Sequence, residues 1–150
     1  MKTLKIAIIA LFILGIVPMA LAEETMRIAK VSEFEGTVEA KIASNDWAPV
    51  QAGTAMKQGD LIRTKANSWA VLDIDGSTVE VKQNSQMKLA ELVADKAKDS
   101  QKTLLDLALG EVLIKAKKLD SEKSKFEVKT PTSIVGVRGT TFSVAVEAVE

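Results

Sequence analysis

The sequence predicts an all-β protein, with a compact β-solenoid-like or β-roll arrangement of short strands and hairpins. Three features predict this class. Turn-forming residues recur at short intervals between residues 35 and 139. The stretches between these turns alternate apolar and polar residues, as half-buried strands do. The phase of the alternation changes at Gly110 and again near Gly139, which indicates a sheet that bends around its own core.

Residues 1–22 are predicted to be a signal peptide and not part of this fold. Two lysines precede an apolar run at residues 6–17, and Ala-Leu-Ala at residues 20–22 has the small residues of a cleavage site. The run is shorter than the about 20 residues that cross a bilayer. We therefore expect cleavage after Ala22 and a single domain over residues 23–150. The alternative is an uncleaved anchor that extends to Leu21.

The clearest predicted element is a hairpin centred on Asp75-Gly76. Residues 70–74 alternate before this pair, and residues 78–82 alternate after it. A two-residue type I′ turn requires positive φ at both central positions, which Asp-Gly tolerates. A further half-buried strand is predicted at residues 38–42 by the same alternation.

Residues 86–102 fit two descriptions. Their composition favours a helix, and Leu89, Leu92 and Val93 fit one helical face. The alternation of Met87 and Leu89 favours a strand instead. We predict a strand over residues 86–92, followed by a charged loop or one short helix near residues 93–101.

Two glycines mark changes of direction in the C-terminal third. Residues 105–109 carry leucines in one phase, whereas the apolar residues of 112–116 follow the opposite phase. A β-bulge or sharp bend at Gly110 explains this change, because one extra residue reverses the facing of those that follow. Residues 135–146 are likewise predicted as two short strands joined at Gly139.

Composition excludes several classes of protein. The chain has 20 basic and 20 acidic residues and no Cys, His or Tyr. Its lysines between residues 115 and 129 are interleaved with acids, whereas a nucleic-acid binder needs a concentrated basic face. Without Cys, neither a disulfide framework nor a lipid-modified Cys anchor is available.

The same composition argues against catalysis and against a metal or cofactor site. Acid–base chemistry near neutral pH would need strongly shifted carboxylates or lysines, because no His is present. Asp73, Asp75 and Glu80 resemble the start of a Ca²⁺ loop, but the ligand set of such a loop is incomplete. We therefore expect no enzyme, no cofactor and no metal, and we interpret these three acids as turn residues.

Six short motifs occur in order along the chain and resemble those of the FecR domain, a bacterial envelope module. They include Gly-Asp followed by Leu-Ile-Arg-Thr, the Asp-Gly-Ser hairpin, and Val-Arg-Gly-Thr-Thr-Phe near the end. The matching stretches are residues 36–38, 47–53, 56–64, 75–81, 110–112 and 126–142. Each motif alone is weak, but their order over about 110 residues makes a specific resemblance.

The resemblance implies an all-β roll or solenoid-like domain in the bacterial envelope. The best-known members of the family pass a signal from an outer-membrane receptor to a cytoplasmic sigma factor. They carry a cytoplasmic anti-sigma segment and a transmembrane helix, whereas this sequence shows a predicted signal peptide in that place. Direct regulation of a sigma factor is therefore not expected.

Four residues are candidates for binding a partner. Arg138 could present its planar guanidinium to a carboxylate beside Thr140; the alternative is that Arg138 pairs with an internal acid or carbonyl at the bend. Trp47 and Trp69 could anchor a peptide or a glycan, although tryptophans in so small a domain more often cap the core.

These observations predict an exported, periplasmic or secreted module that acts by protein–protein interaction, as a signalling or scaffold component of the envelope. Exposed strand edges and a face with aromatic or Arg anchors would serve such binding. The alternative is a module that binds the cell wall, through peptidoglycan or another glycan. We expect no nucleic-acid partner and no stable membrane span once the signal peptide is removed.

Overall fold

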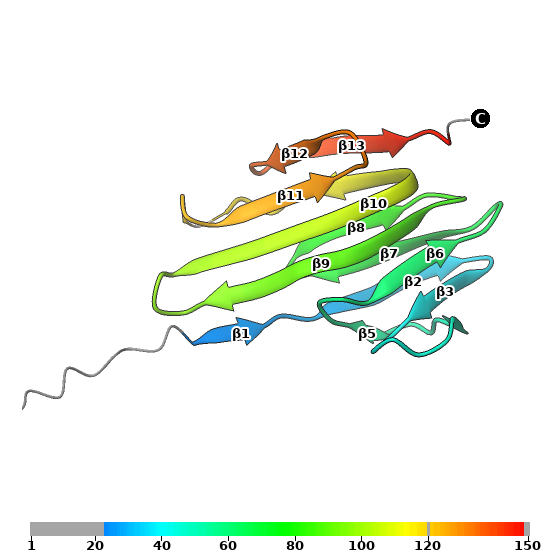
Figure 1. Ribbon diagram of the computed structural model, residues 1–150, viewed down its shortest axis with the longest axis horizontal. Coiled ribbons are helices and arrows are strands. Elements are labelled where there is room, and N and C mark those ends of the chain that lie inside the picture. Colours follow the sequence, from blue (N-terminus) through cyan, green and yellow to red (C-terminus); the bar gives the residue numbers. More distant parts are fainter. Residues whose placement is uncertain (1–22, 120, 149–150) are drawn as a thin grey trace, which may run out of the picture.

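Every helix or strand assigned in the computed structural model, which describes residues 23–119 and 121–148, is a β-strand (Figure 1). The predicted all-β class is therefore confirmed, and the predicted signal peptide at residues 1–22 lies outside the described residues. The strands are β1 (Glu24–Met26), β2 (Ala29–Glu35), β3 (Val38–Lys41), β4 (Ala48–Pro49), β5 (Ala55–Met56), β6 (Leu61–Thr64), β7 (Trp69–Ile74), β8 (Ser77–Val81), β9 (Gln86–Asp95), β10 (Ser100–Lys115), β11 (Lys125–Lys129), β12 (Ile134–Val137) and β13 (Thr141–Val146).

The strands form one 13-stranded sheet that curls back on itself as a half-barrel, with β7 and β8 behind β9 (Figure 1). Its main path has the order β4-β3-β6-β9-β10-β8-β7-β2-β5. The first layer holds β3, β6 and β9, and the second holds β2, β7 and β8. Strand β10 belongs to both layers, because its first part pairs with β9 and its second part with β8.

Gly110 is the point at which β10 turns from one layer into the other. Residues before it pair with β9 and β11, and residues after it pair with β8 and β13. Its φ of 94° lies in the left-handed region that glycine tolerates. The phase of burial changes here. Before Gly110 the odd-numbered residues Leu105 and Leu107 are buried, and after it the even-numbered residues Val112 and Ile114 are buried. The predicted bend at Gly110 is confirmed.

At the Gly110 end, the chain crosses from one layer to the other in the β2–β3, β6–β7 and β8–β9 links and in β10 itself. Buried hydroxyl groups connect these crossings. Ser68 Oγ accepts from the backbone N–H of Thr37 at 2.8 Å, and Thr64 Oγ1 accepts from that of Ser85 at 3.1 Å. Ser85 Oγ in turn accepts from the backbone N–H of Glu111 at 2.9 Å. Each hydroxyl therefore satisfies a backbone group of the neighbouring crossing, as buried polar groups require.

The hairpin predicted at Asp75-Gly76 is confirmed. Ile74 lies opposite Ser77, so the turn has two central residues, and their φ values are 52° and 86°. The strands predicted on either side of Gly139 are also present, as β12 and β13.

The strand predicted over residues 86–92 is confirmed, and of the two alternatives predicted for residues 93–101 the short helix is wrong. Strand β9 continues to Asp95, a turn follows, and β10 begins at Ser100. The pairing of β9 with β10 shifts so that Ala90 is an extra residue in β9. This bulge places Leu89 and Leu92 on the same buried face three residues apart, which imitates the spacing of a helix.

The hydrophobic core fills the space between the layers. Leu89 and Leu105 of the first layer and Leu72 and Ile114 of the second are all fully buried. They belong to one continuous cluster of buried side chains, to which nearly every long strand contributes. Alternate residues of each strand face this cluster, so the polar residues between them face solvent.

Candidate functional site

The outer strands of the two layers, β12 and β13, form the least protected edge of the sheet. In the described residues, β12 pairs with β11 alone and β13 with β10 alone. Neither strand contains a charged residue or proline, the usual protections of an edge. Ile134 at the start of β12 is 63% exposed. We call these two strands the β12–β13 edge.

The opposite margin of the sheet is better protected. Strand β4 has two residues and ends on Pro49, and β5 also has two residues. Short strands and proline both limit the backbone that an added strand could pair with. The β12–β13 edge is therefore the candidate surface for adding a strand.

Trp69 lies in a groove of about 820 Å³ at the Gly110 end. The Trp69 side chain is half-buried, and its Nε1 donates a hydrogen bond to Glu35 Oε2 at 3.2 Å. The groove is also lined by three amide side chains and four glutamates: Asn67, Gln83, Asn84, Glu35, Glu80, Glu111 and Glu147. An aromatic ring with amides and carboxylates around it can bind a polar ligand by stacking and hydrogen bonds.

Trp47 has a different environment. The Arg63 guanidinium lies 4.2 Å from the centroid of the Trp47 ring, in a cation–π contact. Arg63 Nε also donates to Glu39 Oε2 at 2.7 Å. That hydrogen bond lowers the pKa of the Glu39 carboxyl, against the opposing effect of desolvation. Neither tryptophan belongs to the buried core cluster.

Arg138 and Thr140 lie in the loop between β12 and β13. Arg138 is exposed, and its Nη2 donates to the backbone carbonyl of Glu122 at 3.2 Å. The carbonyl of Thr140 accepts from the backbone N–H of Ala116 at 3.3 Å. The loop lies far along the chain from both tryptophans and lines neither the Trp69 groove nor the Arg63 contact. The four predicted residues therefore do not form one site.

The three acids interpreted as turn residues each make a hydrogen bond or an ion pair within the protein. Asp73 Oδ1 accepts from the backbone N–H of Gly76, Asp75 pairs with Arg27, and Glu80 pairs with Lys82. In the part of the chain that the structure describes, no three His, Cys, Asp or Glu side chains are grouped as a metal site would need.

Ser85 and Lys88 have the S-x-x-K spacing that some serine hydrolases use for a nucleophile and its base. The structure gives Ser85 a different role. Its side chain is buried, and its hydroxyl is hydrogen-bonded to the backbone of Glu111. Lys88 is exposed on β9, so the pair does not present an accessible nucleophile.

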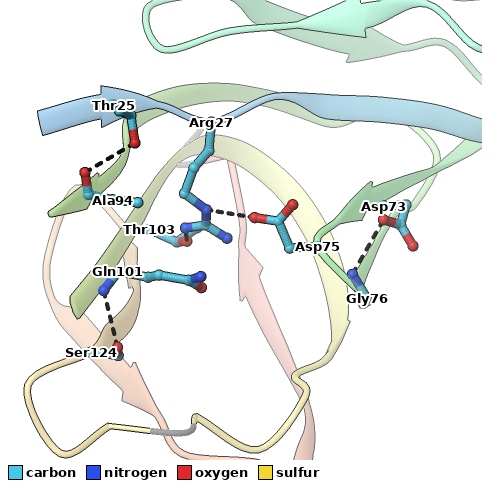
Figure 2. A network of polar contacts seen from close by, with 9 residues as sticks. All are labelled: Thr25, Arg27, Asp73, Asp75, Gly76, Ala94, Gln101, Thr103 and Ser124. Atoms are coloured by element: carbon cyan, nitrogen blue, oxygen red, sulfur yellow. Dashed lines mark hydrogen bonds and ion pairs between the residues drawn. The ribbon is translucent and has the colours of Figure 1, made fainter. Parts of the chain in front are cut away.

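Sequence reasoning missed Arg27 and the buried hydroxyls. Arg27 has no motif around it, and its partners Asp75 and Thr103 are 48 and 76 residues away (Figure 2). Ser68 and Ser85 stand in stretches that look like ordinary polar turns. Only the pairing of the layers brings these residues to their partners.

Comparison with known proteins gives one result. The family model described as FecR protein matches residues 60–149. No curated protein and no solved structure matches this chain. Among the residues described, no helix is long and apolar enough to cross a membrane.

Proposed function

The chain belongs to the FecR protein family, and from this membership we propose that it is an exported, non-enzymatic module that binds a partner protein in the bacterial envelope. The family is associated with envelope signalling, so a role in signalling or as a scaffold fits the match. The curled sheet would be the roll-like scaffold that carries the binding surface.

The observation that carries this proposal is the β12–β13 edge. An extended segment of a partner can pair with an exposed strand, and its main-chain hydrogen bonds then supply affinity. Ile134 would add an apolar contact beside that pairing, since 63% of its surface is open to solvent. A groove of about 440 Å³ runs beside β13 and the turn before β12, with room for side chains of such a segment.

The test is affinity capture from solubilised envelope with the exported protein and two variants. Ile134→Asp places a charge at the β12–β13 edge, and Met26→Asp places the same charge on β1, where Met26 is 70% exposed. A specific protein should be captured by the wild type and by Met26→Asp but lost with Ile134→Asp. Equal capture by both variants would show that the partner does not bind at the β12–β13 edge.

A second candidate function, binding of peptidoglycan or another glycan, is favoured by the Trp69 groove. Stacking of a sugar ring on the Trp69 indole, with hydrogen bonds from the three amides, is the chemistry that the groove offers. Retention on isolated sacculi that is lost in Trp69→Ala, with no captured protein, would select this function. Quenching of tryptophan fluorescence by the glycan, compared with Trp47→Phe, would identify the ring involved.

The proposed export can be tested by measuring the mass of the protein isolated from cells. A mature protein that begins at Glu23 would show that residues 1–22 are removed. A full-length mass in the membrane fraction would support the uncleaved anchor instead.

A further inference from the structure

A second cavity, separate from the β12–β13 edge and the Trp69 groove, opens at the other end of the layers. Its volume is about 380 Å³. It is lined by the β7–β8 turn, by the β9–β10 turn, and by residues 117–119 and the serines at 121 and 124 between β10 and β11. This volume lies within the range that small-ligand pockets occupy.

Arg27 reaches this cavity from the link between β1 and β2 and contacts both layers (Figure 2). Its Nε donates to Asp75 Oδ2 at 2.6 Å, and its Nη1 donates to Thr103 Oγ1 at 2.8 Å. Only 10% of the side chain is exposed. Within the described residues its Nη2 donates no hydrogen bond. The guanidinium is thus held in a fixed orientation with one donor group available.

Four lysines surround the same cavity. Lys96, Lys117, Lys118 and Lys125 line it, all are exposed, and none forms an ion pair with a described residue. The carboxylates in the lining are Asp75, Asp95 and Asp99. Arg27 pairs with Asp75, and Lys98 Nζ lies 2.9 Å from Asp95 Oδ2. Among the described lining residues, one acid, Asp99, therefore remains without an ion pair against four lysines.

Neutral hydrogen-bond donors complete the lining. Ser121, Ser124 and Gln101, which carry two hydroxyls and a side-chain amide, also line the cavity. Ser124 Oγ accepts from the backbone N–H of Gln101 at 3.0 Å, which fixes its position, and it donates to no acceptor among the described residues. Lysines, an oriented arginine and hydroxyls are the groups that bind oxygen-rich anions.

We propose that this cavity binds a phosphate group that carries more than one negative charge. Four lysines carry more positive charge than a ligand with a single carboxylate would neutralise, whereas a phosphate ester or a polyphosphate offers several charged oxygens to point-charge donors such as lysine. The phosphate could belong to a soluble ligand or to a lipid whose headgroup is a phosphate monoester, since both present the same multiply charged group. The inference uses none of the residues on which the proposed protein interaction depends.

Calorimetric titration of the exported protein with inorganic tripolyphosphate, at constant ionic strength, tests the phosphate site. The variant Lys117→Gln/Lys118→Gln should weaken binding by about tenfold, because two charge-assisted contacts are lost. The control Lys30→Gln/Lys88→Gln removes the same charge from exposed positions outside the cavity and should leave binding unchanged. Arg27→Gln should also weaken binding, provided that circular dichroism shows the native fold.

Sedimentation with vesicles distinguishes the two sources of phosphate. Retention on vesicles that contain phosphatidic acid, a phosphate monoester with more than one negative charge, but not on phosphatidylcholine vesicles, with competition by tripolyphosphate, would assign a lipid headgroup. Binding of tripolyphosphate without retention on either vesicle would assign a soluble ligand. The inference is overturned if neither probe binds, or if the control variant loses as much affinity as Lys117→Gln/Lys118→Gln.

Discussion

A Cβ atom at position 110 would clash with Oγ of Ser85. The backbone of β10 turns between layers directly against this buried hydroxyl, whose oxygen accepts from the N–H of Glu111 at 2.9 Å. The absence of a side chain at residue 110 and the presence of a hydroxyl at residue 85 are therefore two parts of one junction.

Gly110→Ala should destabilise the protein by about 3 kcal/mol or more, because a positive φ and a clash with Ser85 act together. Gly59→Ala separates the two effects, since Gly59 has a φ of 95° with nothing near its missing Cβ. It should cost about 1 kcal/mol. Gly136→Ala, with neither constraint, serves as the control. Urea unfolding measures all three, and equal losses for Gly110→Ala and Gly59→Ala would contradict the clash.

Ser85→Ala should cost about 1–3 kcal/mol, because it removes the buried Ser85 hydroxyl and leaves the backbone N–H of Glu111 without its acceptor. Ser32→Ala is the matched control, since Ser32 Oγ makes one exposed hydrogen bond to the Val71 carbonyl. Its loss should be within about 0.5 kcal/mol of zero. Hydrogen exchange at Glu111 should become faster in Ser85→Ala. Unchanged protection of the Glu111 N–H would show that the Ser85 hydroxyl does not stabilise the backbone of β10 where it passes between the layers.

The Asp95–Lys98 pair should make stability depend on pH at both extremes. The Lys98 side chain, with the backbone N–H groups of Lys98 and Ala97, holds the pKa of Asp95 below 3.8, and Asp95 raises the pKa of Lys98 above 10.5. The Asp95 contribution is complete above pH 3.8 and is lost as the pH falls through the folded-state pKa. The Lys98 contribution is complete below pH 10.5 and is lost as the pH rises through its folded-state pKa.

Urea unfolding of the wild type and of Asp95→Asn measures this dependence. The difference in unfolding free energy should be constant between these two pH values and should shrink below the lower one. A difference that grows on acidification would contradict the sign of the Asp95 shift.

Arg63→Gln should raise the pKa of Glu39 toward 4.5, because the Arg63 hydrogen bond is the largest cause of its lowering. Titration of the Glu39 carboxyl by NMR measures this change. Lys65→Gln should produce a smaller rise, since Lys65 acts only through its more distant charge. A larger effect from Lys65→Gln would show that the contact between Arg63 and Glu39 is not maintained in solution.

Local pattern in the sequence was sufficient for several elements. The Asp75-Gly76 hairpin follows from residues that are adjacent in the chain, and the bend at Gly110 follows from a change of phase within ten residues. Residues 86–102 were harder, because a bulge at Ala90 gives a strand the three-residue spacing of a helix. Composition cannot distinguish these two cases, since the bulge exists only when β9 pairs with β10.

The candidate surfaces depended more strongly on the tertiary structure. Trp47 and Trp69 were recognised by residue type, but their partners Arg63 and Glu35 are supplied by neighbouring strands. The β12–β13 edge could not be identified from sequence, since every predicted strand was equally able to lie at an edge. Strand order decides which backbone groups stay unpaired.

By itself the sequence determined the all-β class, the turns and the family resemblance, because these depend on residues close together in the chain. The tertiary structure alone decided that Arg27 would meet Asp75 and Thr103 and that four lysines would border one cavity. Those contacts join segments 48 and 76 residues apart. They form because burial of apolar side chains closes the two layers, and this closure fixes the positions of the polar groups at their ends.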